Sequence, residues 1–150
     1  MTLEEMQAKL EIQELAGTFS NLEIDVPAQM KLFTKDTQVK VYMGENLAFD
    51  IHGVEELEKG FSQFTAAVKL SHHMNGQHVI KVDGDNATGI LYCRAALVTE
   101  EDGKKFISDN FIWYEDTYKK VGGKWLIDAR TSHFVISDSA TCSVMKSYCA

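Results

Sequence analysis

The chain has 150 residues, which predicts one domain whose core needs neither disulfides nor a metal. A formal net charge of −7 argues against a general nucleic-acid binder, which needs a basic surface, and against docking on anionic lipid. No apolar run approaches the roughly 20 residues of a membrane span, and the N-terminus lacks the regions of a secretory signal. Three cysteines without metal-type spacing suit a reducing compartment, so we expect a cytoplasmic protein.

The first part of the sequence predicts two helices. Thr2 and Glu5 form a capping box that starts the first one. Pro27 suits the first turn of a second, short helix that extends through Phe33. The first helix has a buried stripe at helical spacing: Ala8, Ile12, Leu15, Ala16, Phe19 and Leu22.

A strand pattern and a third helix follow. Val39, Val41 and Met43 alternate with polar residues, which is typical of a half-buried strand, and residues 47–51 are a second candidate. Gly53 then opens the third helix. Its buried stripe comprises Val54, Leu57, Phe61, Phe64 and Val68.

The second half of the chain changes from helical to alternating periodicity and predicts a meander of four long strands. The strands span residues 70–82, 87–99, 106–121 and 124–136. The last turn, at Gly122-Gly123, is typical of a β-hairpin, and residues 137–150 are interpreted as a polar tail. Helices followed by antiparallel strands predict a single α+β domain with the helices on one face of a curved sheet.

Two charged residues lie among large aromatic residues on the last two strands. If the hairpin turns at the glycine pair, Asp116 and Arg130 lie within about one residue of direct opposition and can pair. Charges in such a setting must be paired or exposed. We therefore interpret the pair first as a structural tie, ahead of a direct catalytic role.

Several fragments occur in an order and spacing that is informative about the fold. They are Leu32 to Asp36, Ile51 to Gly53, His73 to Gln77, Val82 to Asp85, and the set Tyr114, Asp116, Trp125 and Arg130. Together these fragments resemble the SnoaL-like domains of the nuclear-transport-factor-like superfamily, over roughly Leu10 to Phe134. The resemblance implies a cone-shaped α+β barrel, with three N-terminal helices packed on a strongly curved, mainly antiparallel sheet. Such domains often form homodimers, and each domain has an apolar pocket. The family includes polyketide cyclases, dehydratases and steroid isomerases.

The resemblance also implies an acid–base site. His73 matches the family's catalytic histidine, and an imidazole can take and return a proton near neutrality; a histidine hydrogen-bonded at a strand start is the structural alternative. Its partner should be a carboxylate at the end of the first helix. Asp25 is the more family-like candidate, and Glu23 is the runner-up because burial would raise its pKa. Dehydratases of the family have a tyrosine where this chain has Phe19.

Structural roles compete with these assignments. A solvated helix end would account for Glu23, and a helix cap would account for Asp25. Tyr42 could offer a phenol to a substrate oxygen, but core packing would explain it equally well. Asn110 and Tyr114 share the strand parity of Asp116, so these residues can line one face. The candidate substrate-binding set is therefore Phe19, Tyr42, Asn110, Tyr114, Asp116 and Arg130.

The histidines near His73 do not predict a metal site. His72 faces the opposite way on the strand. His72 and His78 share parity but lie about 20 Å apart on a regular strand, at roughly 3.3 Å per residue. A break at Gly76 could change this arrangement. We place His78 on the strand near the rim of the sheet.

These observations predict a cofactor-independent lyase or isomerase acting on a small apolar ring or polyketide-like molecule. His73 would abstract a proton, Asp25 or Glu23 would orient the imidazole or deliver the proton, and Tyr42 or Asn110 would steady a developing oxyanion. The alternative is a non-catalytic, dimeric protein that binds a hydrophobic ligand. Large side chains on both faces of residues 109–118 predict a homodimer through the outer face of the long strands, with no nucleic-acid or membrane partner.

Overall fold

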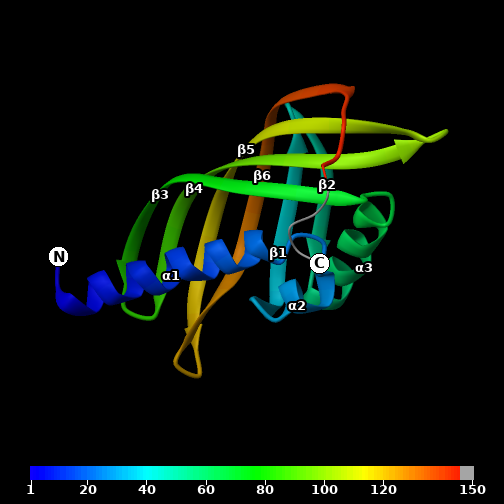
Figure 1. Cartoon of the computed structure of the whole chain (residues 1–150). Helices are drawn as coiled ribbons and strands as arrows, with labels where there is room; N and C mark the ends of the chain where they lie inside the picture. Colours follow the sequence, from blue (N-terminus) through cyan, green and yellow to red (C-terminus); the bar gives the residue numbers. More distant parts are fainter. Residues whose placement is uncertain (146–150) are drawn as a thin grey trace.

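The computed structural model describes residues 1–145. Its three helices lie against the concave face of one curved, six-stranded sheet (Figure 1). The helices are α1 (Leu3–Asn21), α2 (Val26–Met30) and α3 (Val54–Thr65). The strands are β1 (Phe33–Met43), β2 (Asn46–His52), β3 (Leu70–Asp83), β4 (Asn86–Glu101), β5 (Lys104–Val121) and β6 (Lys124–Thr141). The predicted α+β architecture is confirmed.

The strand order in the sheet is β2-β1-β6-β5-β4-β3. Every neighbouring pair is antiparallel except β1 and β6, which run parallel. The four long strands form the predicted meander, while the β1–β2 hairpin joins it at the β6 edge. The sheet thus curls around α1, which packs mainly against β3 and also contacts β6.

The start of α1 follows from its sequence. The Thr2 hydroxyl accepts a hydrogen bond from the Glu5 backbone N–H at 3.1 Å, and the Glu5 carboxylate accepts one from the Thr2 N–H at 2.7 Å. The predicted capping box is therefore confirmed. The buried stripe that follows, Ala8, Ile12, Leu15, Ala16 and Phe19, packs onto the sheet, whereas Leu22 is the C-cap residue and only half-buried.

Two predicted boundaries are wrong. Helix α2 ends at Met30, and β1 begins at Phe33, where the prediction extended the helix. The sequence pattern missed this strand start, because Phe33 pairs with Ile127 of β6 while the polar residues 34–37 that follow show no apolar alternation. Residues 137–141 also continue β6 by pairing with β5, so the predicted tail begins later. Its last part, residues 146–150, lies outside the described residues.

The β5–β6 hairpin turns where the sequence predicts. Val121 pairs with Lys124, and the two loop residues Gly122 and Gly123 have φ angles of +57° and +81°. Two consecutive positive φ angles define the turn that matches strand twist, and glycine adopts them at no steric cost. Within residues 1–145, none of the helices is both long and apolar enough to cross a membrane.

Candidate active site

The C-terminus of α1 ends in an unusual backbone conformation at Glu23. The residue lies one position beyond the C-cap Leu22 and has a φ angle of +54°. Glycine is the usual residue at this left-handed position, and other residues held there cluster at functional sites. The reversal sends the chain into α2 and turns the Glu23 side chain towards β3.

The carboxylate of Glu23 meets His73 on β3. Its Oε2 atom lies 2.7 Å from Nδ1 of the imidazole, and its Oε1 atom accepts the His73 backbone N–H at 3.2 Å. The Ser71 hydroxyl donates a further short hydrogen bond to Oε2. The Glu23 side chain is 29% exposed and the His73 side chain is 16% exposed, so the pair is partly shielded from solvent. Three donors therefore fix one carboxylate against one ring.

Hydrogen bonding keeps this carboxylate ionised. Partial burial raises the pKa of Glu23, but the hydrogen bonds from Ser71 and His73 outweigh it and hold that pKa below its ordinary value. Burial therefore acts in the expected direction, but the expected net rise in the pKa of Glu23 is wrong, because hydrogen bonding reverses it. A carboxylate at the negative end of the α1 dipole is also disfavoured, and the same donors offset that cost.

The geometry assigns a role to each ring nitrogen of His73. An ionised carboxylate can only accept hydrogen bonds, so Nδ1 carries the hydrogen that faces Glu23. In the neutral ring, Nε2 then holds the free lone pair. A histidine oriented in this way can act as a general base through Nε2, while the carboxylate stabilises the imidazolium that forms.

Asp25 does not take the position that the sequence favoured. Its side chain accepts the Ala28 backbone N–H at 3.2 Å and is the N-cap of α2. The capping alternative thus describes Asp25, and the structure brings Glu23, not Asp25, to His73. The reason is the left-handed reversal at Glu23, which the sequence pattern does not reveal.

A β-bulge decides which histidines of β3 face inward. Ser71, His73 and Asn75 point towards α1, and His72 is exposed on the other face. The register with β4 shifts between Asn75 and His78. His78 therefore returns to the inner face, where its Nε2 lies 3.1 Å from the Tyr118 hydroxyl.

The inward position of His78 corrects its predicted place at the rim. The parity assigned to His72 and His78 was wrong because the bulge adds one residue to β3. Across residues 1–145, no group of three or more His, Cys, Asp or Glu side chains is arranged to hold a metal ion.

A second polar network lies deeper under α1. Arg130 donates from Nε and Nη2 to the two oxygens of Asp116, both at 2.8 Å, and the Tyr118 hydroxyl donates to Asp116 at 2.7 Å. Asp116 and Arg130 occupy directly opposed positions of β5 and β6, so the predicted pairing is confirmed. Burial lowers the pKa of Arg130, but the Asp116 carboxylate more than offsets this and raises it.

Aromatic rings sandwich the Arg130 guanidinium. Its central carbon lies 4.7 Å from the Phe19 ring centre and 4.1 Å from the Tyr114 ring centre, a cation–π arrangement. Phe19 and Tyr114 therefore support the charge of Arg130. The third nitrogen, Nη1, is buried and has no hydrogen-bond partner among the described residues.

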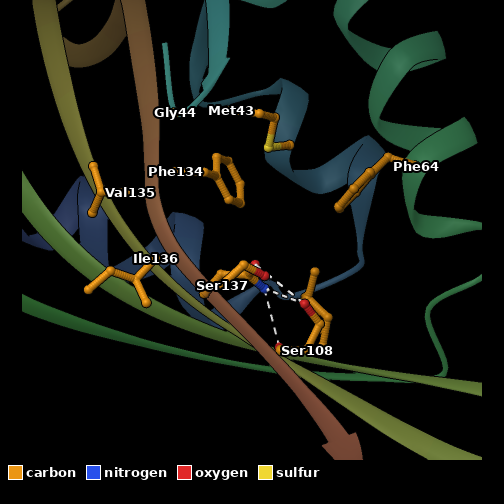
Figure 2. Close-up of a pocket in the computed structure, with 10 residues that line it drawn as sticks. Met43, Gly44, Phe64, Ser108, Phe134, Val135, Ile136 and Ser137 are labelled. Carbon is orange, nitrogen blue, oxygen red and sulfur yellow. Dashed lines mark hydrogen bonds between the residues drawn. The ribbon is translucent and has the colours of Figure 1, made fainter. Parts of the chain in front are cut away.

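A pocket of about 450 Å³ lies between the end of β1, α3 and strands β4, β5 and β6 (Figure 2). Met43 and Phe64 lie across it from Ser108 and Ser137. Its polar atoms centre on Asn110, which is 5% exposed. Apart from Asn110, Ser108 and Ser137 the lining is apolar, and none of it is charged: Met43, Gly44, Phe64, Leu97, Ser108, Asn110, Phe134, Val135, Ile136 and Ser137.

The amide of Asn110 is occupied by protein groups. Its Nδ2 donates to the carbonyls of Ala95 and Ser108 and to the Ser108 hydroxyl, at 3.1–3.2 Å. Its Oδ1 accepts from the Ser137 hydroxyl at 2.9 Å. The two carbonyls fix the amide orientation, because only the NH₂ group can donate to them. No amide hydrogen of Asn110 remains for an oxyanion.

The sheet register connects this pocket to His73. Ala95 on β4 pairs with His73 on one side and with Asn110 on the other. Leu97, which lines the pocket, pairs with Ser71. Since neighbouring strands lie about 4.8 Å apart, the pocket wall adjoins the strand that holds the histidine and its carboxylate partner.

Tyr42 lies on the other face of the sheet. Its ring stacks on His133 at 5.4 Å between centres, and His133 stacks on Trp113 at 3.9 Å. The neighbouring Val41 packs against the core, so strand alternation turns Tyr42 outward. The structure does not bring Tyr42 together with His73.

Sequence reasoning missed two residues that contact Glu23. Ser71 could have been found, because it lies two residues before His73 and therefore shares its face of β3. Gln29 is buried on α2, and its side-chain amide donates to the backbone carbonyl of Glu23 at 2.9 Å. Nothing in the local pattern signals that contact, which depends on how α1 and α2 meet.

Comparisons with known proteins agree with this fold. Residues 4–131 match the family model of the SnoaL-like domain, and no curated protein matches in sequence. A candidate scytalone dehydratase from Novosphingobium aromaticivorans has 19% identity and a TM-score of 0.77, over 97% of this chain and 94% of that chain. A type 2 hexachlorocyclohexane dehydrochlorinase has 12% identity and a TM-score of 0.77, over 99% of each chain. An NTF2-like protein with a cystatin-like fold, from Novosphingobium aromaticivorans, has 20% identity and a TM-score of 0.65, over 89% of this chain and 85% of that chain.

Proposed function

Because the chain belongs to the SnoaL-like domain family, we propose that it is a cofactor-independent lyase or isomerase that begins its reaction by abstracting a proton. The observation that carries this proposal is the 2.7 Å contact between the Glu23 carboxylate and Nδ1 of His73. A base oriented by a carboxylate, beside an apolar pocket, is the arrangement that general-base chemistry needs. The names of the similar structures, a dehydratase and a dehydrochlorinase, support the same class.

The reaction would run through Nε2 of His73. This atom takes a proton from a C–H bond next to a carbonyl or other activating group, and Glu23 stabilises the imidazolium. The electron pair of the broken C–H bond then forms a double bond. In a lyase it expels a leaving group from the adjacent carbon; in an isomerase the imidazolium returns the proton at another carbon.

Arg130 has a buried donor free to stabilise negative charge, although it does not line the pocket. Its Nη1 atom is a buried donor without a partner among the described residues, and charged donors in shielded sites stabilise developing anions strongly. Asn110, which the sequence offered for this role together with Tyr42, has both amide hydrogens engaged. We therefore propose a pocket-shaping role for Asn110 and, for a ligand that extends beyond the pocket towards α1, a charge-stabilising role for Arg130.

The substrate would be a small, uncharged molecule with an apolar ring or a polyketide-like body. The pocket lining is apolar apart from the group around Asn110 and offers no charged partner. A volume of about 450 Å³ matches small-molecule sites. A charged ligand body would lose its hydration there without compensation.

We also propose a homodimer formed through the outer face of the long strands. Trp113, His133 and Tyr42 stack there, and Tyr92 and Val79 are 45% and 64% exposed. A monomer needs only one apolar sheet face. A contiguous apolar outer face is typical of an association surface.

Solvent exchange tests the proposed chemistry without knowledge of the natural substrate. A panel of ring ketones and of rings with a hydroxyl or halide next to an acidic C–H would be incubated with the protein in deuterated water. We expect deuterium at the acidic carbon, or loss of the adjacent group, and loss of either reaction in His73→Gln. Leu10→Glu, on the exposed face of α1, is the matched control.

The alternative is a protein that binds a hydrophobic ligand without chemistry, which the largely apolar lining favours. Ligand-induced shifts in the NMR spectrum with no exchange or elimination across the panel would support that function. The same shifts in wild type and His73→Gln would show that the dyad is not used.

A further inference from the structure

We infer that Gln29 is a positioning residue that holds Glu23 in the conformation from which its carboxylate reaches His73. The inference rests on the proposed function, because it concerns the same dyad. Gln29 lies on α2, is 4% exposed and does not contact His73. It acts on the dyad through the backbone at the end of α1.

The side-chain amide of Gln29 bridges two carbonyls of one chain reversal. Its Nε2 atom donates to the Glu23 carbonyl at 2.9 Å and to the Phe19 carbonyl at 3.3 Å. An NH₂ group has two hydrogens, so these contacts use both. The amide therefore joins the last turn of α1, at Phe19, to Glu23, which follows the C-cap residue of the helix.

The backbone at Glu23 needs such support. Its φ angle of +54° is a conformation that residues other than glycine rarely adopt. The last carbonyls of a helix also lack partners within the helix. The Thr18 and Ser20 carbonyls are satisfied by the backbone N–H groups of Leu22 and Glu23, whereas Phe19 and Glu23 depend on Gln29. Removing the amide would leave both carbonyls short of a donor and release the reversal.

Asp25 supports the position of Gln29. It caps α2 through the Ala28 N–H, and the Gln29 N–H bonds to the Asp25 carbonyl at 3.0 Å. The cap thus fixes the start of the helix that presents Gln29. This gives Asp25 an indirect effect on His73, although it lies outside the dyad.

The test reads the His73 ring directly. In wild type, a carboxylate at Nδ1 selects the tautomer with hydrogen on Nδ1, and long-range proton–nitrogen NMR reports it. Gln29→Met keeps the side-chain volume but removes both donors. We expect wild type to show one tautomer with hydrogen on Nδ1, and Gln29→Met to show a mixture with hydrogen on Nε2. Gln63→Met, at an exposed position of α3, is the matched control and should match wild type.

A second variant, made at Glu23, distinguishes a specific positioning role of Gln29 from a general disturbance of the fold. Glu23→Gly removes the carboxylate while suiting the positive φ angle, so it should lose the Nδ1 preference and stay folded. In that background, Gln29→Met should add no further change in the tautomer ratio, because its effect passes through Glu23.

Each outcome bears on a separate claim. A folded Gln29→Met protein with the wild-type tautomer overturns the inference and leaves the dyad intact. A wild-type ring with hydrogen on Nε2 overturns the dyad itself, and the inference with it. Gln29→Asn, which keeps the amide on a shorter stem, replaces Gln29→Met if the latter does not fold. Failure of both to fold would show that Gln29 supports the whole domain, which also overturns a specific positioning role.

Discussion

Asp116 and Arg130 face each other directly across β5 and β6, and two hydrogen bonds of 2.8 Å join their side chains. The side chains are 0% and 2% exposed. Tyr118 donates a third hydrogen bond to the carboxylate, and the aromatic rings of Phe19 and Tyr114 enclose the guanidinium. The two charges are thus compensated by each other and not by water.

Removing one member of this pair should lower the free energy of unfolding more than removing both members. Arg130→Met leaves the Asp116 carboxylate buried without its partner, so we expect a loss of about 3 kcal/mol or more in the free energy of unfolding. The double change with Asp116→Leu removes both charges and should recover part of that loss. Urea unfolding measures both values. A single mutant as stable as wild type would show that the carboxylate is satisfied without Arg130.

The stability of the fold should depend on pH through His78. Burial lowers the pKa of His78, and together with the nearby Arg130 charge it outweighs the opposing effect of the Asp116 carboxylate. As pH falls below about 6.5, the ordinary value, the unfolded chain binds a proton at this residue before the folded protein does. Stability from this group is therefore present above that value and is lost as pH falls towards the folded-state pKa.

Comparing stability against pH in two variants isolates this effect. His78→Gln keeps a donor for the Tyr118 hydroxyl but cannot titrate, so its stability should fall less between pH 7 and about 5.5. His72→Gln changes the exposed histidine of the same strand and should retain the wild-type slope. Identical slopes in wild type and His78→Gln would contradict the prediction.

Local sequence patterns were sufficient to predict most of the fold. The capping box at Thr2, the glycine pair at 122–123 and the long alternating strands each act through neighbours in sequence, so they were readable without tertiary contacts. At the boundaries that failed, Phe33 pairs with Ile127 of β6, and the polar residues 137–141 pair with β5. Sequence alternation cannot show pairing of that kind.

The candidate site was predictable only in part. The pairing of Asp116 with Arg130 followed from hairpin register, and a carboxylate at the end of α1 was expected near His73. Which carboxylate reaches the ring depended on the φ angle of Glu23, and the face of His78 depended on the bulge after Asn75. Both are backbone irregularities that residue type alone does not specify.

The outer sheet face should govern the oligomeric state. We expect a light-scattering mass of about twice the 16.9 kDa chain at micromolar concentration. Tyr92 is 45% exposed between buried Leu91 and Cys93, so Tyr92→Glu places a charge on that face and should give monomers. Leu10→Glu adds the same charge to exposed α1 and should leave the dimer intact. A wild-type mass near one chain would rule out this interface.

The Ser71 hydroxyl should help to determine the pKa of Glu23. It donates to the Glu23 oxygen that also contacts Nδ1 of His73, and this bond helps to hold the pKa of Glu23 below its ordinary value. Ser71→Ala removes the donor but leaves the desolvation that opposes ionisation. We therefore expect the pKa of Glu23 to rise, as measured by the carbon-13 shift of its carboxyl group against pH.

The same change should move the pH dependence of stability. A carboxylate whose pKa is depressed in the folded state stabilises the protein above its unfolded pKa, and that contribution is lost as pH falls through the folded-state pKa. In Ser71→Ala the folded-state pKa moves towards the unfolded value, so this loss should be smaller and should be complete at a higher pH than in wild type. Ser62→Ala, an exposed serine of α3, is the control and should leave both the carboxyl titration and the acid limb unchanged. An unshifted Glu23 titration in Ser71→Ala would mean that His73 alone keeps the carboxylate ionised.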